Sequence, residues 1–173
     1  MNRLIITLGS IAGAILVFML ALSLIFMNGD LRAEAMQYGE IVGYATMIIS
    51  LSLIYVGIRK FRDDHLDGQI SFLEGFKIGI LITLVASIIY VVGWMILSDW
   101  LAPDFLERYS EFTLNQMRHN GSSTQEIAEA KAMTDKYIEL YKNPLLKAGM
   151  TFMEVFPVGL IITLISSLIL KRK

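Results

Sequence analysis

The chain has 173 residues, 55% of them hydrophobic, and a formal net charge of −1. Its mean hydropathy of +0.59 is well above that of soluble proteins, and a soluble fold could not bury that much apolar surface. The balanced charge argues against a nucleic-acid partner, which requires a basic surface opposite the phosphates. The absence of cysteine excludes disulfides and thiol nucleophiles, and His65 and His119 are too few for an imidazole metal centre. We therefore expect no cofactor and no nucleic acid.

Four stretches with almost no charge follow one another along the chain: residues 4–27, 41–58, 78–97 and 148–170. Each has about the 20 residues that an α-helix needs to cross a hydrocarbon core of about 30 Å. None alternates in polarity as the strands of a membrane barrel do. We predict an all-α integral membrane four-helix bundle, with residues 1–173 as a single transmembrane domain. The first stretch exceeds the core of a cleaved secretory signal, about 7–15 residues, and is expected to remain as a span.

Lys and Arg are concentrated in the connections expected on one side of the membrane. Arg3 precedes the first span, four basic residues lie between positions 59 and 77, and three occupy 171–173. Because cytoplasmic connections carry such an excess, both termini of this multi-pass protein are predicted to be cytoplasmic. Trp94 and Trp100 then flank the outer end of the third span, where indole rings favour the headgroup layer.

The connection between the third and fourth spans, residues 98–147, is predicted to be an extramembrane amphipathic helical segment. Apolar residues recur at helical spacing from Phe105 to Met117. Ser123 and Glu126 then form a capping-box pattern, which starts a second helix beyond Gly121. The two helices either pack as a hairpin against the spans or lie on the outer membrane surface.

Small and polar residues recur on one face of three spans. They are Gly43, Thr46 and Ser50 in the second span, Gly75, Gly79, Thr83 and Ser87 in and before the third, and Gly159, Thr163 and Ser167 in the fourth. Inside lipid, helices associate through close packing of small residues and through side-chain hydrogen bonds. We interpret these faces as helix-packing surfaces, with a polar pathway through the membrane as the alternative.

Glu154 is the most informative single residue, because a carboxylate within an apolar span is costly and usually faces other helices or a water-filled cavity. Pro157 lacks the N–H that would bond to the carbonyl of Met153, so a kink is expected there, with Gly159 loosening the next turn. Glu154, Pro157 and Gly159 are therefore candidate functional residues. The alternative is that Glu154 reaches interfacial water and only fixes helix packing.

The third and fourth spans contain similar segments, GILITLVAS at residues 79–87 and GLIITLISS at 159–167. Apolar spans draw on few residue types, so coincidence explains the similarity. Duplication of a helical hairpin is the alternative.

Three segments together resemble a known family: YATMIISLSLIYVGIRKFRD at residues 44–63, GQISFLEGFKIG at 68–79 and EVFPVG at 154–159. The chain resembles, over nearly its whole length, the bacterial membrane family catalogued as domain of unknown function 4199. The resemblance implies a bacterial inner-membrane location. It implies no substrate and no catalytic residue.

Motifs of metalloproteases, α/β-hydrolases and P-loop proteins are absent from the sequence, so we do not expect an enzyme. A small structural or accessory membrane protein is the favoured function. The alternative is a small oligomeric transporter or channel that uses Glu154 and the Pro157 kink. Membrane lipid is the expected partner, together with other membrane proteins or further copies of this chain.

Overall fold

The computed structural model describes residues 2–28 and 32–172, and most of this chain is helical. The helices are α1 (Asn2–Asn28), α2 (Arg32–Leu51), α3 (Leu53–His65), α4 (Phe72–Leu101), α5 (Phe105–His119), α6 (Thr124–Tyr141) and α7 (Pro144–Leu170). Four helical stretches are long and apolar enough to cross a membrane: Asn2–Met27, Gln37–His65, Phe72–Leu101 and Pro144–Leu170. The second of them combines most of α2 with α3. The predicted all-α class and its four long apolar helical stretches are confirmed.

Local signals fix where the helices between the third and fourth spans begin. Ser123 and Glu126 form the predicted capping box, in which each side chain bonds to the other residue's backbone amide. Gly121 adopts a φ of 78°, a backbone conformation that favours glycine and interrupts the helix between α5 and α6. The side chain of Asn143 caps α7. Pro144 fits the first turn of this helix, because the N–H that proline lacks would have no acceptor within the helix there. Two helices therefore form within residues 98–147.

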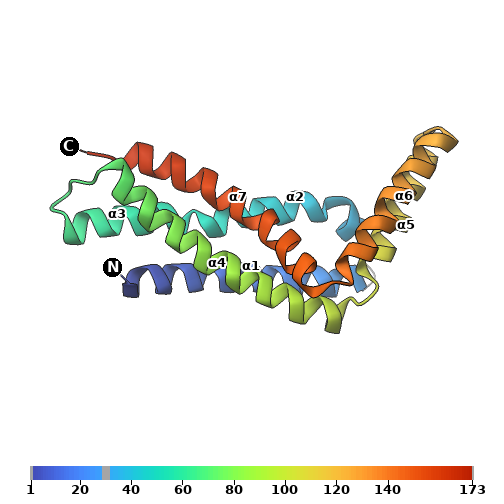
Figure 1. The fold of residues 1–173 in the computed structure, drawn as a ribbon, viewed down its shortest axis with the longest axis horizontal. Helices are drawn as coiled ribbons and strands as arrows, with labels where there is room; N and C mark the ends of the chain where they lie inside the picture. Colours follow the sequence, from blue (N-terminus) through green and yellow to red (C-terminus); the bar gives the residue numbers. More distant parts are fainter. Residues whose placement is uncertain (1, 29–31, 173) are drawn as a thin grey trace.

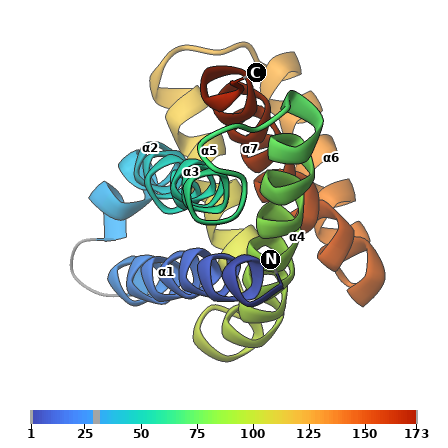
Figure 2. The same cartoon turned by 90° about the vertical axis from the view of Figure 1, so that its left-hand side faces the viewer.

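The long apolar helices run along the long axis of the molecule (Figure 1), with both ends of the chain at one extremity and α5 and α6 projecting from the other. We call these extremities the terminal end and the hairpin end. Helix α4 packs against both α1 and α7, and Figure 2 shows the helices from the terminal end. There Ile70, before α4, and Arg172, after α7, exchange backbone hydrogen bonds of 3.1 and 2.9 Å. This pairing holds the tail against the loop before α4.

Helices α4 and α7 make a reciprocal contact that we call the α4–α7 seam: Gly79, Thr83, Gly159 and Thr163. A Cβ atom added to Gly159 would lie 2.3 Å from Cγ2 of Thr83, and one added to Gly79 would lie 2.6 Å from Cγ2 of Thr163. The two threonines are fully buried, and their Oγ1 atoms are 3.2 Å apart. Glycine is required for this close approach of two helices.

Apolar side chains fill the terminal half of the molecule around this seam. Ile54, Ile58 and Ile82 are fully buried there and belong to one core cluster with residues of α1, α2 and α7. Other large apolar residues, such as Ile49 and Leu73, are exposed on the outside. Exposed apolar surface of this kind is what helices that face lipid require.

Candidate functional site

A cavity of about 780 Å³ lies in the hairpin half of the molecule. Residues of α1, α2, α4, α5, α6 and α7 line it. Toward the terminal end its described lining stops at Leu16, Met47, Tyr90 and Glu154. Beyond these residues the buried core begins, so the cavity does not continue to the terminal end.

Glu154 lines this cavity from α7, and its side chain is exposed rather than enclosed by neighbouring helices. No described residue forms a hydrogen bond or an ion pair with it, although Tyr90 and Tyr141 lie within electrostatic range of the carboxylate. Pro157 follows one turn later, and α7 continues as one helix through it to Leu170. Gly159 belongs to the α4–α7 seam. The three candidate residues therefore lie where the open half of α7 meets its tightly packed half.

A second carboxylate, Glu40 of α2, lines the same cavity and accepts a hydrogen bond from the hydroxyl of Tyr109 on α5. Burial, followed by this bond to Glu40, raises the pKa of Tyr109 to about 12. The phenol therefore remains a proton donor at neutral pH. This bond connects the α5–α6 hairpin to the second span and fixes part of the cavity wall. No sequence pattern indicates this bond, because the two residues are 69 positions apart.

The described lining of the cavity is acidic and aromatic. Glu40 and Glu154 are its charged residues, and no Lys, Arg or His is among the described residues that line it. The aromatic lining residues are Tyr44, Tyr90, Trp94, Phe105, Tyr109, Tyr137 and Tyr141. Five methionines complete much of the apolar surface: Met19, Met27, Met47, Met133 and Met150. A mostly apolar wall with a few polar groups is the usual composition of a small-molecule site.

Trp94 differs from the sequence-based expectation for the two tryptophans. Trp100 is 78% exposed, as an indole at the headgroup layer would be, whereas Trp94 is only 8% exposed. Phe105 of α5 packs edge-on against Trp94, with ring centroids 5.6 Å apart. The expectation that Trp94 faces headgroups is therefore wrong, because the α5–α6 hairpin covers it. Its Nε1–H is buried and has no acceptor among the described residues.

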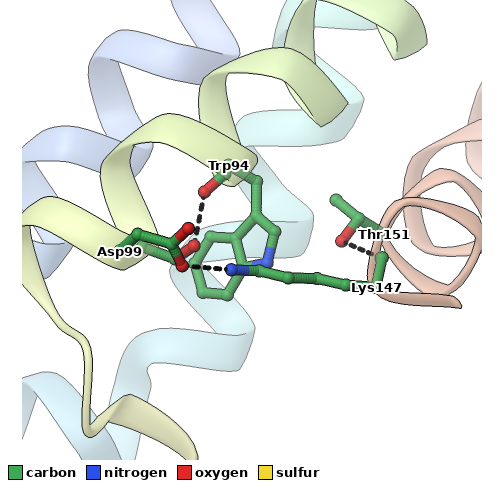
Figure 3. Close-up of polar contacts among 5 residues, drawn as sticks. Trp94, Asp99, Lys147 and Thr151 are labelled. Carbon is green, nitrogen blue, oxygen red and sulfur yellow. Dashed lines mark hydrogen bonds and ion pairs between the residues drawn. The ribbon is translucent and has the colours of Figure 1, made fainter. Parts of the chain in front are cut away.

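Next to Trp94, Lys147 of α7 extends toward Asp99 of α4 (Figure 3), and its Nζ lies 2.6 Å from Oδ1 of Asp99. The side chain of Lys147 is only 11% exposed, whereas that of Asp99 is 73% exposed. This ion pair links two spans at the hairpin end, beside a smaller cavity of about 170 Å³ that Trp94 also lines. Sequence reasoning missed the pair, because 48 positions separate its members.

The small-polar faces divide between packing and the cavity. Gly75 faces Ser167 across α4 and α7, with an added Cβ 3.3 Å from its Oγ, which extends the seam toward the terminal end. Ser50 and Ser87 are buried, and their hydroxyls have no described hydrogen-bond partner. In α2, by contrast, Gly43 and Thr46 line the cavity, and no described heavy atom lies within 4 Å of a Cβ added to Gly43. The α2 face thus leaves space that the other two faces fill.

Among the described residues, no three His, Cys, Asp or Glu side chains are grouped so that they could hold a metal ion. A family model described as "Protein of unknown function (DUF4199)" matches residues 7–172. The chain belongs to this family. Comparisons with curated proteins and with solved structures give no match. The family description assigns no activity.

Proposed function

We propose that this chain is a small accessory protein of the bacterial inner membrane that binds an amphipathic small molecule in the cavity at its hairpin end. The observation that carries the proposal is a cavity of about 780 Å³ that contains Glu154 without a described hydrogen-bond or ion-pair partner. Small-molecule sites in proteins commonly have volumes of about 300–1,000 Å³ and few polar groups in an apolar wall. The cavity fits both criteria.

The distribution of Lys and Arg supports cytoplasmic termini, which would direct the cavity and the α5–α6 hairpin to the outside. In this orientation the hairpin is an extramembrane cover over the cavity. Reporter proteins fused after Lys173 should therefore report the cytoplasm, and one inserted near Asn120 should report the outside. A fusion after Lys173 that reports the outside would reverse the orientation.

Binding is tested by filling the cavity. Gly43→Leu adds a side chain to the cavity wall at a position with no described atom within 4 Å of the new Cβ. Gly149→Leu is the matched control, because it also meets no described atom within 4 Å and does not line the cavity. Native mass spectrometry in mild detergent should detect a bound amphiphile on the unaltered chain and on Gly149→Leu but not on Gly43→Leu. Equal occupancy of all three would place the bound molecule elsewhere and contradict the proposal.

Transport is the second candidate, and the position of Pro157 supports it. Pro157 lies inside α7 between the carboxylate of Glu154 and the α4–α7 seam, where a missing backbone hydrogen bond makes a helix easier to bend. Transport would require the seam to open toward the terminal end. In reconstituted vesicles, Glu154→Gln should then abolish an ion-coupled flux while the protein stays folded. An unchanged flux, or none with the unaltered chain, would leave binding as the function.

A further inference from the structure

We propose that the cavity selects an organic cation, an ammonium group carrying apolar substituents and a nearby oxygen acceptor. This inference rests on the proposed binding function and specifies the ligand. It combines three properties of the described lining: its acidic charge, its aromatic surface and one buried donor without an acceptor.

The charge of the lining favours a positive ligand. Glu40 and Glu154 are the charged groups among the described lining residues, and no described basic residue faces them across the cavity. Carboxylates on the wall of a mostly apolar cavity attract a cation more strongly than free carboxylates in water do, and a bound cation in turn favours the ionised carboxylate. Glu40 already accepts a hydrogen bond from Tyr109. Glu154, which has no described hydrogen-bond partner, therefore has its full acceptor capacity available to a ligand.

The aromatic surface suits an ammonium group better than a small hydrated ion. Tyr90 and Trp94 of α4 and Tyr141 of α6 line the cavity together with Glu154. The faces of aromatic rings attract ammonium groups, and quaternary ammonium ligands are commonly held in aromatic cages. The apolar remainder of the wall, which includes five methionines, suits hydrocarbon substituents. A ligand with a single positive centre and an apolar part satisfies both kinds of surface.

Trp94 indicates the oxygen acceptor. Its indole lines the cavity and is buried, yet its Nε1–H donates to no described group. A buried donor without an acceptor costs about 1–3 kcal/mol, and a carbonyl or ether oxygen of a ligand would remove that cost. Phosphate is a poor choice of acceptor, because its charge would meet two carboxylates and no described basic residue. The nearby Lys147 is already paired with Asp99 at 2.6 Å. The lining therefore disfavours phospholipid headgroups.

Three probes with short tails separate these properties. Hexanoylcholine has the ammonium, the carbonyl and an apolar tail. Its isostere 3,3-dimethylbutyl hexanoate has carbon in place of the ammonium nitrogen, and hexylphosphocholine adds a phosphate. Binding is followed by the fluorescence of Trp94 in lipid nanodiscs, with Trp100→Phe as the background and empty nanodiscs as the blank. Trp100 is exposed and lines neither cavity, so its replacement leaves Trp94 as the only tryptophan.

We expect hexanoylcholine to bind at least about tenfold more tightly than the neutral isostere and than hexylphosphocholine, since tenfold corresponds to about 1.4 kcal/mol of ionic and cation–π attraction. Glu154→Gln should weaken hexanoylcholine about tenfold and change the isostere by less than about twofold. Glu129→Gln is the control, because it removes an exposed carboxylate of α6 outside the cavity. It should change neither affinity.

Equal affinity for hexanoylcholine and its isostere on the unaltered chain would overturn the inference, and this comparison does not depend on the folding of any Glu154 variant. Tighter binding of hexylphosphocholine would overturn it too, in favour of a lipid headgroup. In one outcome no probe binds, but mass spectrometry still finds an amphiphile that the unaltered chain holds and Gly43→Leu does not. The inference about charge then fails and the proposed binding function stands. If both measurements fail, the proposed function fails as well.

Discussion

Replacing Gly159 with alanine should weaken the contact between α4 and α7. The added Cβ would lie 2.3 Å from Cγ2 and 3.0 Å from Oγ1 of Thr83. Thr83 cannot easily turn away, because it is β-branched and its Oγ1 donates a hydrogen bond of 2.9 Å to the carbonyl of Gly79. Carbon atoms in contact lie about 3.5–4.0 Å apart, so the two helices must separate by roughly 1 Å at this point.

The size of the effect follows from three contributions. Overpacking of a close-packed interior costs about 1–3 kcal/mol. Separation of the helices also weakens the Thr83–Thr163 contact, and interhelical hydrogen bonds in membranes contribute about 0.6 kcal/mol. Alanine regains at most about 1 kcal/mol through its higher helix propensity. Gly159→Ala should therefore lower the free energy of unfolding by about 1–2 kcal/mol.

The measurement is a titration with denaturing detergent in mixed micelles, followed by circular dichroism. Gly43→Ala is the matched control, because the same methyl group meets no described atom within 4 Å. It should leave the free energy of unfolding unchanged or raise it by up to about 1 kcal/mol. If Gly159→Ala and Gly43→Ala were equally stable, the close approach of α4 and α7 would be refuted.

Three further predictions follow from other contacts. Asp99→Asn should destabilise the protein more than Lys147→Met does in the same titration. The first change leaves the ammonium of Lys147, which is 11% exposed, without its partner, whereas the second leaves Asp99, which is 73% exposed and can be solvated. Equal effects of the two changes would contradict the geometry of the ion pair. Hydrogen bonds from the Ser123 backbone and side chain lower the pKa of Glu126, so the capping box should stabilise α6 above about pH 4.3 and lose this effect as the pH falls from there through the lowered pKa. Amide protection at residues 123–126, taken relative to the intrinsic exchange rate at each pH, should therefore fall between pH 7 and pH 3, and unchanged protection would count against the capping box. The free energies of unfolding of Glu154→Leu and Glu154→Gln should agree within about 1 kcal/mol, since no described group forms a hydrogen bond with the carboxylate. A much less stable leucine variant would indicate a structural role for Glu154.

The sequence predicted features that depend on neighbouring residues. The Ser123–Glu126 capping box is predicted from four consecutive residues, and it starts α6 at Thr124 as its geometry requires. The third apolar stretch begins at residue 78, whereas α4 begins at Phe72. The two differ because an apolar stretch stops at charged residues such as Lys77, while the backbone hydrogen bonds of a helix continue through them. The second span likewise extends through α3 to His65. Charge thus marks the limits of the apolar stretch rather than those of the helix.

Features that join distant parts of the chain were not predictable in the same way. The similarity between residues 79–87 and 159–167 involves the residues of the α4–α7 seam, since in the structure Gly79 contacts Thr163 and Gly159 contacts Thr83. Two similar segments on neighbouring antiparallel helices can contact each other reciprocally, whether the similarity arose by coincidence or by duplication. No sequence pattern indicates the cavity, because Gly43 and Thr46, which line it, follow the same small-polar pattern as the packed faces. Spacing along one helix does not show whether another helix covers it.

If the acidic cavity opens to the outside, a single cysteine in its wall should be modified from that side of the membrane. The natural chain has no cysteine, so Thr46→Cys in the cavity wall and Thr163→Cys in the α4–α7 seam each provide a unique thiol. Both are treated from outside with membrane-impermeant methanethiosulfonates that carry either a trimethylammonium or a sulfonate group.

Relative to a free thiol in solution, Thr46→Cys should favour the cationic reagent by at least about tenfold, because acid-lined clefts concentrate cations by about 10–1,000-fold. Thr163→Cys should not react, because Thr163 is fully buried. Failure of Thr46→Cys to react, or reaction without preference for the cation, would contradict an outward-facing acidic cavity.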